Sequence, residues 1–181
     1  MKYNIKDVIL YRVLNTKYQL NGDNMKNKGI RFLTQAAIIA AIYATLTIVL
    51  GFMSFGVVQV RIAEALCILP FFTPAAIPGL FVGCFIGNLF GPNLGIWDII
   101  GGSLATLVSA YLASKIKIKW LVPLPAVIIN AVWVGYLLYK VLELPLLPSM
   151  GSVALGQIVA CYVIGLPLLL ILERYGKKIF T

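Results

Sequence analysis

The sequence predicts an all-α integral membrane protein with six transmembrane helices. Of its 181 residues 61% are hydrophobic and only 12% are charged, whereas roughly 25% of the residues in a typical soluble domain are charged. The charges are also unevenly spaced. Five stretches contain no Asp, Glu, Lys or Arg: 32–60, 65–97, 99–114, 120–139 and 144–172. Several of them exceed the roughly 20 residues that a helix needs to cross the hydrocarbon core of a bilayer.

Three prolines divide the longest of these stretches, residues 65–97. As one helix it would reach about 50 Å, which is too long for a single crossing. Proline removes a backbone donor and clashes with the preceding turn, so we expect a break between about residues 73 and 76. This break raises the predicted count to six helices: 32–53, 57–73, 76–91, 97–115, 120–142 and 151–174.

The basic residues predict the orientation of these helices. They cluster before the first helix, between the fourth and fifth, and after the sixth: Lys26, Lys28 and Arg31; Lys115, Lys117 and Lys119; Arg174, Lys177 and Lys178. Six crossings place all three clusters on one face, so the positive-inside rule predicts a multi-pass protein of the cell membrane with both termini in the cytoplasm. The net charge of +9 is then explained by helix ends and anionic lipid, and no nucleic-acid partner is expected.

Residues 1–24 differ from the rest of the chain. They are polar and of mixed charge, and they lack the apolar core and cleavage site of a secretory signal. We expect residues 25–181 to form a single membrane domain. Our hypothesis is that translation begins at Met25 and that residues 1–24 are a misassigned leader; the alternative is a short cytoplasmic tail. Peptides from this segment in a mass spectrum of the natively expressed protein would contradict the hypothesis.

Several residue types needed for catalysis are missing. The chain has no histidine, which excludes a Ser-His-Asp triad and a His-ligated metal. Its three cysteines, Cys67, Cys84 and Cys161, lie in apolar stretches without CxxC spacing, so they are expected to be small packing residues. No GxxxxGK[ST] motif is present, and energy from ATP would have to come through partner proteins. We therefore predict no enzyme, no metal and no cofactor.

Small residues recur at helical spacing on two of the predicted helices. Ala36, Ala40 and Ala44 form a smooth strip on the first, which indicates either a docking face for a separate membrane subunit or packing within the chain. On the third helix a glycine occurs at every fourth position: Gly79, Gly83, Gly87 and Gly91. This pattern predicts close contact with another helix.

Polar residues inside the apolar stretches are the candidate binding residues. Arg61 and Glu64 are three positions apart, so they share a helix face and can pair. A charge at membrane depth costs about 2.5–3.5 kcal/mol and usually marks function. The alternatives are that these two side chains reach the outer interface, and that Asp98 caps a helix. The full candidate set is Gln59, Arg61, Glu64, Asn88, Trp97, Asp98, Asn130 and Trp133.

Two segments of the sequence resemble one transporter family. The stretch VQVRIAEALCILPFFTPAAIPGLFVGCFIGNLFGP, followed by WDIIGGSLATL, is similar to the QueT family of S-components, the substrate-binding subunits of energy-coupling factor (ECF) transporters. The resemblance covers roughly residues 28–178. It implies an S-component-like six-helix bundle in complex with a transmembrane T-component and two ATPases. It also implies that the strip Ala36, Ala40 and Ala44 contacts the T-component.

The resemblance further implies uptake of a queuosine precursor, a 7-deazaguanine such as queuine or its aminomethyl or cyano precursor. Such a base presents an amide N–H beside an exocyclic amine, and one carboxylate, Glu64 or Asp98, is able to accept both. Arg61, Gln59, Asn88 or Asn130 would serve the carbonyl, and Trp97 or Trp133 would stack on the ring.

Two other interpretations of the sequence stay open. One is an S-component for another vitamin or nucleobase, because one scaffold serves unrelated ligands. The other is a membrane scaffold protein without transport activity. Co-purification of a T-component and two ATPases would favour a transporter subunit over a scaffold.

Overall fold

The computed structural model describes residues 5–54, 60–91 and 95–175, and every element in these ranges is a helix. The all-α prediction is therefore confirmed for this part of the chain. The chain divides into two compact units, residues 1–34 and 35–181. Helix α1 (Ile5–Val49) supplies the first unit and, with its residues 35–49, the first helix of the second.

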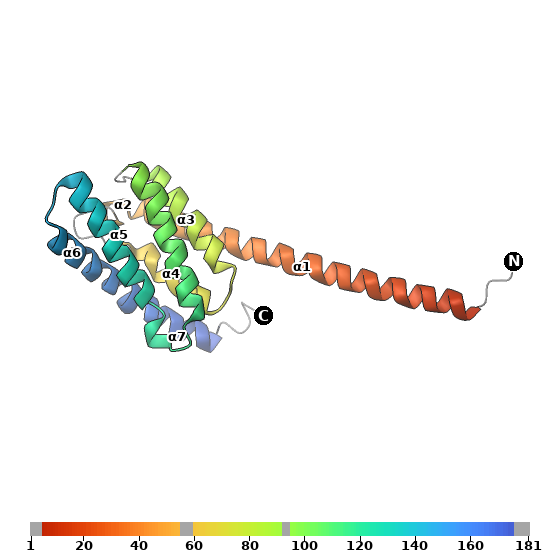
Figure 1. Ribbon diagram of the computed structural model, residues 1–181. Coiled ribbons are helices and arrows are strands. Elements are labelled where there is room, and N and C mark those ends of the chain that lie inside the picture. The colour runs from red at the N-terminus through yellow and green to blue at the C-terminus, as the bar shows by residue number, and fades with distance from the viewer. Residues whose placement is uncertain (1–4, 55–59, 92–94, 176–181) are drawn as a thin grey trace. The chain divides into compact units, whose positions relative to one another are not determined.

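The second unit contains the remaining elements (Figure 1). Two of them, η1 and η3, are 3-10 helices, and η2 and η4 are π-helical turns. In chain order the elements are α2 (Gly51–Ser54), η1 (Ile62–Phe71), α3 (Ala76–Phe90), η2 (Asp98–Gly102), α4 (Ser103–Lys115), η3 (Lys119–Leu121), α5 (Leu124–Leu142), α6 (Leu146–Ile158), η4 (Val159–Gly165) and α7 (Leu166–Tyr175).

The glycine-spaced face of α3 packs against α1. A Cβ atom built on Gly83 would lie 2.8 Å from the carbonyl oxygen of Ala40, so only glycine permits this approach. Equivalent contacts occur one turn on either side, where Gly79 meets Ala36 and Gly87 meets Thr47. The prediction of close helix contact is confirmed for these three glycines. The fourth glycine of the pattern follows the last residue of α3.

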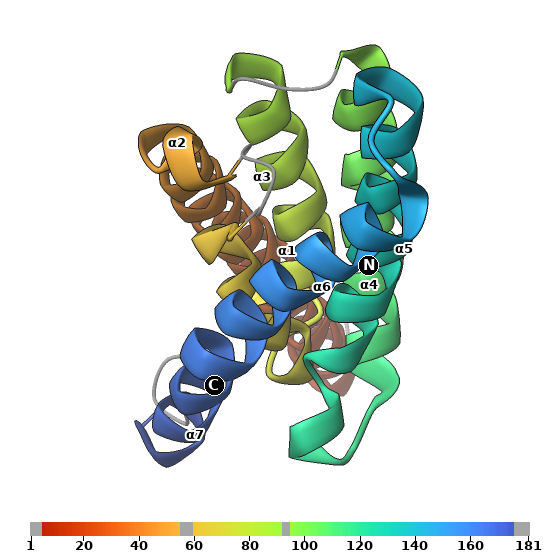
Figure 2. The same cartoon turned by 90° about the vertical axis from the view of Figure 1, so that its left-hand side faces the viewer.

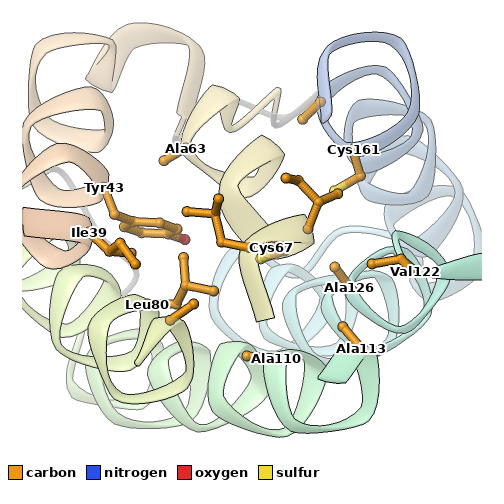
Figure 3. Close-up of a cluster of buried hydrophobic side chains, with 14 of the residues drawn as sticks. Ile39, Tyr43, Ala63, Cys67, Leu80, Ala110, Ala113, Val122, Ala126 and Cys161 are labelled. Carbon is orange, nitrogen blue, oxygen red and sulfur yellow. The ribbon is translucent and has the colours of Figure 1, made fainter. Parts of the chain in front are cut away.

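Helices α3, α4 and α5 lie side by side, and each contacts the next. Elements α6, η4 and α7 form one continuous helix that runs obliquely to these three (Figure 2), and its π-helical turn packs on η1. The buried core lies where these elements meet. Figure 3 shows side chains from α1, η1, α3, α4, α5 and η4 converging there, among them Tyr43, Cys67, Leu80, Ala110, Ala126 and Cys161.

Three helical stretches are long and apolar enough to cross a membrane: 27–49, 119–142 and 146–174. Six crossings are not confirmed. Of the predicted helix 57–73, residues 57–59 lie outside the described residues, and the rest contains the ten-residue η1. With the 15 residues of α3, both elements are shorter than the roughly 20 residues of a typical α-helical crossing. The charge-free stretches overestimated helix length because they also contain the turns between helices.

Two predicted helices have other bounds in the structure, and for one of them the reason is identifiable. The helix predicted to begin at residue 151 begins at Leu146. Pro148 falls in its first turn, where a backbone N–H has no partner within the helix and proline is tolerated. The first helix, predicted over residues 32–53, runs from Ile5 to Val49 and is followed by the short α2.

Candidate functional site

The η1 segment places two polar side chains on one side. In a 3-10 helix residues three apart lie directly above one another, so Glu64 and Cys67 share a side. Arg61 immediately precedes the helix in an extended conformation, and the backbone N–H of Glu64 donates to its carbonyl oxygen at 2.9 Å. All three side chains are buried. Because Arg61 lies outside the helix, the common helix face of Arg61 and Glu64 stays a prediction.

The chain supplies a donor for each carboxylate oxygen of Glu64. The hydroxyl of Tyr43 donates to Oε1 at 2.5 Å, and the thiol of Cys67 donates to Oε2 at 2.9 Å. A second thiol, that of Cys161, donates to the Glu64 backbone carbonyl at 3.6 Å and lies 3.5 Å from Oε1 of Gln157. Glu64 thus joins α1 and η1 to the long helix formed by α6, η4 and α7.

A cysteine sulfur is the centre of a second group of contacts. Sγ of Cys84, on α3, lies 3.7 Å from Nη1 of Arg61, 3.6 Å from Nδ2 of Asn88 and 3.4 Å from Oγ1 of Thr106. Each of these three groups is a donor, and they come from the start of η1, from α3 and from α4. The sulfur therefore accepts weak hydrogen bonds that connect three elements in the core.

Asp98 begins the π-helical turn η2 beside Asn88. Nδ2 of Asn88 donates to the Asp98 backbone carbonyl at 3.0 Å. A Cβ atom on Gly102 would lie 3.0 Å from both Nδ2 of Asn88 and Oδ1 of Asp98, so the amide and the carboxylate adjoin the bare backbone of this glycine. We call Arg61, Glu64, Cys84, Asn88 and Asp98 the polar cluster.

The structure brings together four of the eight predicted site residues, places three elsewhere and does not describe the eighth. Trp97 is 67% exposed although it precedes the buried Asp98. Asn130 is buried on α5, and its Nδ2 has no hydrogen-bond partner among the described residues. Trp133, one turn further on, packs its indole ring on Gly101. Gln59 lies outside the described residues.

An apolar groove of about 660 Å³ lies between α4, α5 and α6. Its lining residues are Gly101, Leu104, Ala105, Val108, Ile128, Ile129, Val132, Trp133, Tyr136, Leu146 and Met150. The turn η2 therefore has two different sides, because Gly102 adjoins the polar cluster and Gly101 adjoins the groove.

The predicted docking strip on α1 is covered within the chain. Ala36, Ala40 and Ala44 are all buried, and the first two contact the glycines of α3. This arrangement matches the packing interpretation of the strip. The neighbouring alanines beside the strip, Ala37 and Ala41, are exposed.

Sequence reasoning missed Cys84 as a member of the polar cluster. It also missed the residues that bond to the cluster, Tyr43, Cys67 and Thr106. Only Cys67 carried a usable signal, since it is three residues from Glu64 as Arg61 is. The others were hidden because an uncharged residue in an apolar stretch is ordinarily a packing residue. No three Cys, Asp or Glu side chains in the described ranges are placed to hold a metal ion.

Comparison with known proteins identifies the family. A profile of the QueT transporter family matches residues 33–174. A protein of Lactococcus lactis subsp. cremoris (strain MG1363), named queuosine precursor transporter QueT, is 28% identical over 172 residues, which cover 86% of this chain and 98% of that protein. No solved structure matched the chain. The family match spans most of the second unit and includes the whole polar cluster. The chain belongs to the QueT transporter family, and it is a membrane transporter and not an enzyme.

Proposed function

We propose that this chain is the substrate-binding S-component of an ECF transporter and that it binds a queuosine precursor of the 7-deazaguanine type. The observation that carries the proposal is the polar cluster, in which two acids and one base are buried among apolar helices. Ionisable groups are costly in such surroundings and mark substrate pathways when they occur there. The name of the Lactococcus relative supports this class of substrate.

The chemistry of the polar cluster is complementary to a deazaguanine. A carboxylate is able to accept the ring N–H and the exocyclic amine together, and the cluster contains two carboxylates. The Arg61 guanidinium carries five N–H donors in a fixed fork, which suits the carbonyl of the base. The buried Nδ2 of Asn130 offers a further donor. Trp133 or Trp97 would supply a stacking surface.

The proposal extends to topology and partners. We propose six crossings with both termini in the cytoplasm, because the basic residues at 26–31, 115–119 and 174–178 then share one face. The absence of an ATP-binding motif in the sequence supports a complex with a T-component and two ATPases. Since Ala36, Ala40 and Ala44 are covered by the chain itself, the exposed Ala37 and Ala41 beside them are the better candidates for contact with the T-component.

A thermal-shift panel tests the substrate. The purified protein in detergent is heated with queuine, its aminomethyl and cyano precursors, guanine and common vitamins. A ligand at 100 times its dissociation constant stabilises the folded state by about 2.7 kcal/mol. We expect this stabilisation with one or more deazaguanines and its loss in Arg61→Met. Stabilisation by a vitamin instead, or by no compound of the panel, contradicts the proposed substrate.

A co-purification experiment tests the partners separately. The tagged chain, expressed in its own host and extracted in mild detergent, is expected to bring down one T-component and two ATPases. Recovery of the chain alone, from membranes in which those subunits are present, argues against the ECF assembly and leaves the substrate assignment unaffected.

A further inference from the structure

We infer that the groove between α4, α5 and α6 binds a zwitterionic phospholipid whose headgroup carries a primary amine. One acyl chain occupies the groove, Lys140 binds the phosphate and Glu143 binds the amine. This lipid site is separate from the polar cluster and goes beyond the proposed function, because it concerns the contact of the transporter with the membrane and not its substrate.

The groove opens on the outside of the helical bundle. Its volume of about 660 Å³ lies within the range of roughly 300–1,000 Å³ that is usual for ligand sites, and none of its lining side chains is charged. Leu104, Val108 and Val132 in its lining are about half-exposed. Because the chain is a membrane transporter, its exposed apolar surface meets hydrocarbon. Apolar cavities exclude water, so an acyl chain is the occupant that matches this lining.

The groove follows α5 for nearly the depth of one leaflet. Ile128 and Tyr136 are the first and the last α5 residues of the lining, and the helix rises by about 12 Å between them. One leaflet contributes about 15 Å of hydrocarbon, half of a core of about 30 Å. The groove therefore holds most of the length of one acyl chain, and the headgroup lies just beyond one of its ends.

The lining face of α5 continues to a cation. Ile129, Trp133 and Tyr136 line the groove, and a further step of four residues leads to Lys140 in the last turn of the helix. Steps of four, three and four residues keep these side chains on one face. Tyr136 and Lys140 are both exposed, and such side chains mark the level where hydrocarbon gives way to the polar interface. The headgroup is therefore expected at the Lys140 end.

Two opposite charges lie at this end of α5. Lys140 and Glu143 are the only charged residues from position 120 to 172. Among the described residues they form no ion pair, unlike Lys119 and Glu173, whose Nζ and Oε1 atoms are 2.7 Å apart. Glu143 has a φ of 56°, in the left-handed region where glycine or asparagine is usual after a helix. Backbone preference does not explain an acid at this position, whereas an amine ligand does.

The two charges select among headgroups. The ammonium of Lys140 makes charge-assisted hydrogen bonds to a phosphate, and the carboxylate of Glu143 accepts them from a primary amine. A headgroup with a net negative charge would satisfy the lysine and be repelled by the acid. A trimethylated amine would offer the acid no N–H donor. The site therefore prefers phosphatidylethanolamine to phosphatidylglycerol and to phosphatidylcholine.

Native mass spectrometry of the full chain tests this preference. The protein is stripped of lipid in detergent and titrated with these three lipids, which carry the same acyl chains. We expect one phosphatidylethanolamine per chain, bound about tenfold more tightly than the other two, as the gain of a hydrogen bond to a charged group implies. Lys140→Gln is expected to weaken its binding about tenfold for the same reason. Glu143→Gln is expected to remove the preference among the three headgroups.

Two variants fill the groove, and one is the matched control. Val132→Phe from α5 and Val108→Phe from α4 are each expected to weaken the binding of all three lipids. Lys115→Gln is the control, because the ammonium of Lys115 also lies over a tyrosine ring, 5.2 Å from its centroid compared with 5.8 Å for Lys140. Neither Lys115 nor that ring lines the groove, so this variant should bind lipid like the parent.

Tryptophan fluorescence locates the acyl chain without a change in the groove. When the exposed Trp97 and Trp120 are replaced by Phe, the remaining Trp133 reports from the lining. Phosphatidylethanolamine with brominated acyl chains is expected to quench it. Unbrominated phosphatidylethanolamine should restore the fluorescence, and the same amount of unbrominated phosphatidylglycerol should not.

Three results would overturn the lipid site. Equal binding of the three lipids by the parent, or equal weakening in Lys140→Gln and Lys115→Gln, would mean that the groove meets only the ordinary lipid shell. Undiminished binding in both Val132→Phe and Val108→Phe, with Trp133 unquenched, would place the lipid elsewhere. A dimer of the parent that is lost in Val132→Phe would assign the groove to a second copy of the chain.

Discussion

The contact between α1 and α3 and the groove among α4, α5 and α6 are built in opposite ways. In the first, glycines of α3 meet the backbone of α1, and a single added Cβ would collide with a carbonyl oxygen. In the second, large aliphatic and aromatic side chains line a groove of about 660 Å³, although Gly135 of α5 meets the Met150 backbone of α6 within the same group of helices. The difference teaches that small residues bring helices together locally and that larger side chains beside them leave space.

The polar cluster lies between the α1–α3 contact and the groove. Its member Cys84 is on α3, whose other face packs on α1. Thr106, which bonds to Cys84, is on α4, and the far side of α4 lines the groove with Leu104 and Val108. A substitution that enlarges a residue at the α1–α3 contact should therefore move the backbone. A substitution that enlarges a residue beside the groove should first displace side chains. Four substitutions test this distinction.

The largest effect is expected for Gly83→Ala. The new Cβ would lie 2.8 Å from the Ala40 carbonyl oxygen and 3.0 Å from its Cα, so the two backbones must separate, and we expect the free energy of unfolding to fall by about 3 kcal/mol. Unfolding in an SDS titration, followed by circular dichroism, measures it. Gly151→Ala, on α6 with no atom within 4 Å of the new Cβ, is the control. A loss equal to that of the control would refute close packing at this contact.

A smaller and reversible effect is expected for Gly101→Ala. Its Cβ would overlap the indole ring of Trp133, and the free energy of unfolding should fall by about 2 kcal/mol. The obstacle is a side chain, so the second substitution Trp133→Leu should restore part of the loss. No truncation can relieve Gly83→Ala in this way. If Trp133→Leu gives no recovery in the same SDS titration, the two contacts do not differ as described.

Tyr43→Phe should cost about 1–2 kcal/mol, because it leaves one oxygen of the buried Glu64 without its hydroxyl donor. The Cβ of this residue, which packs on Gly83, is kept. Tyr136→Phe, at an exposed tyrosine of the groove, is the control and should change the free energy of unfolding by less than about 0.5 kcal/mol. Equal losses in the two variants would show that the hydroxyl of Tyr43 contributes nothing.

The smallest effect is expected for Val132→Phe. Val132 is half-exposed in the lining of the groove, so the larger ring has space and the free energy of unfolding should change by less than about 1 kcal/mol. Thermal unfolding of the variant and the parent in the same detergent measures it. A loss as large as that of Gly83→Ala would mean that the groove is closed in the folded protein.

The sequence predicted the parts of the fold that depend on regular spacing. The all-helical class and the contact made by Gly79, Gly83 and Gly87 both follow from such spacing. The direction of the alanine strip did not follow. Ala37 and Ala41 have the same spacing as Ala36 and Ala40, and spacing cannot tell which pair faces inward.

The contacts of the candidate site were mostly beyond sequence reasoning. The hydrogen bond from Tyr43 to Glu64 joins residues 21 positions apart. The Cys84 sulfur accepts weak hydrogen bonds from Arg61 and Thr106 only because η1, α3 and α4 meet there. Helix length was overestimated for a related reason, since an apolar stretch does not reveal whether it forms an α-helix or, as in η1, a 3-10 helix. The family resemblance supplied the class of transporter, which periodicity alone would not have supplied.

The π-helical turn η4 has a consequence for changes of chain length. A turn of this kind holds one residue more than an α-helical turn, so deleting one residue within Val159–Gly165 would restore regular α-helix. The residues after the deletion, among them the fully buried Leu169, would keep nearly the same faces, because the turn had already absorbed the extra residue. The same deletion in the regular helix α6 would rotate everything after it by about 100° about the helix axis and turn Leu169 away from the core. The position of a single-residue deletion along this helix, and not its chemical character, would then decide whether the chain still folds.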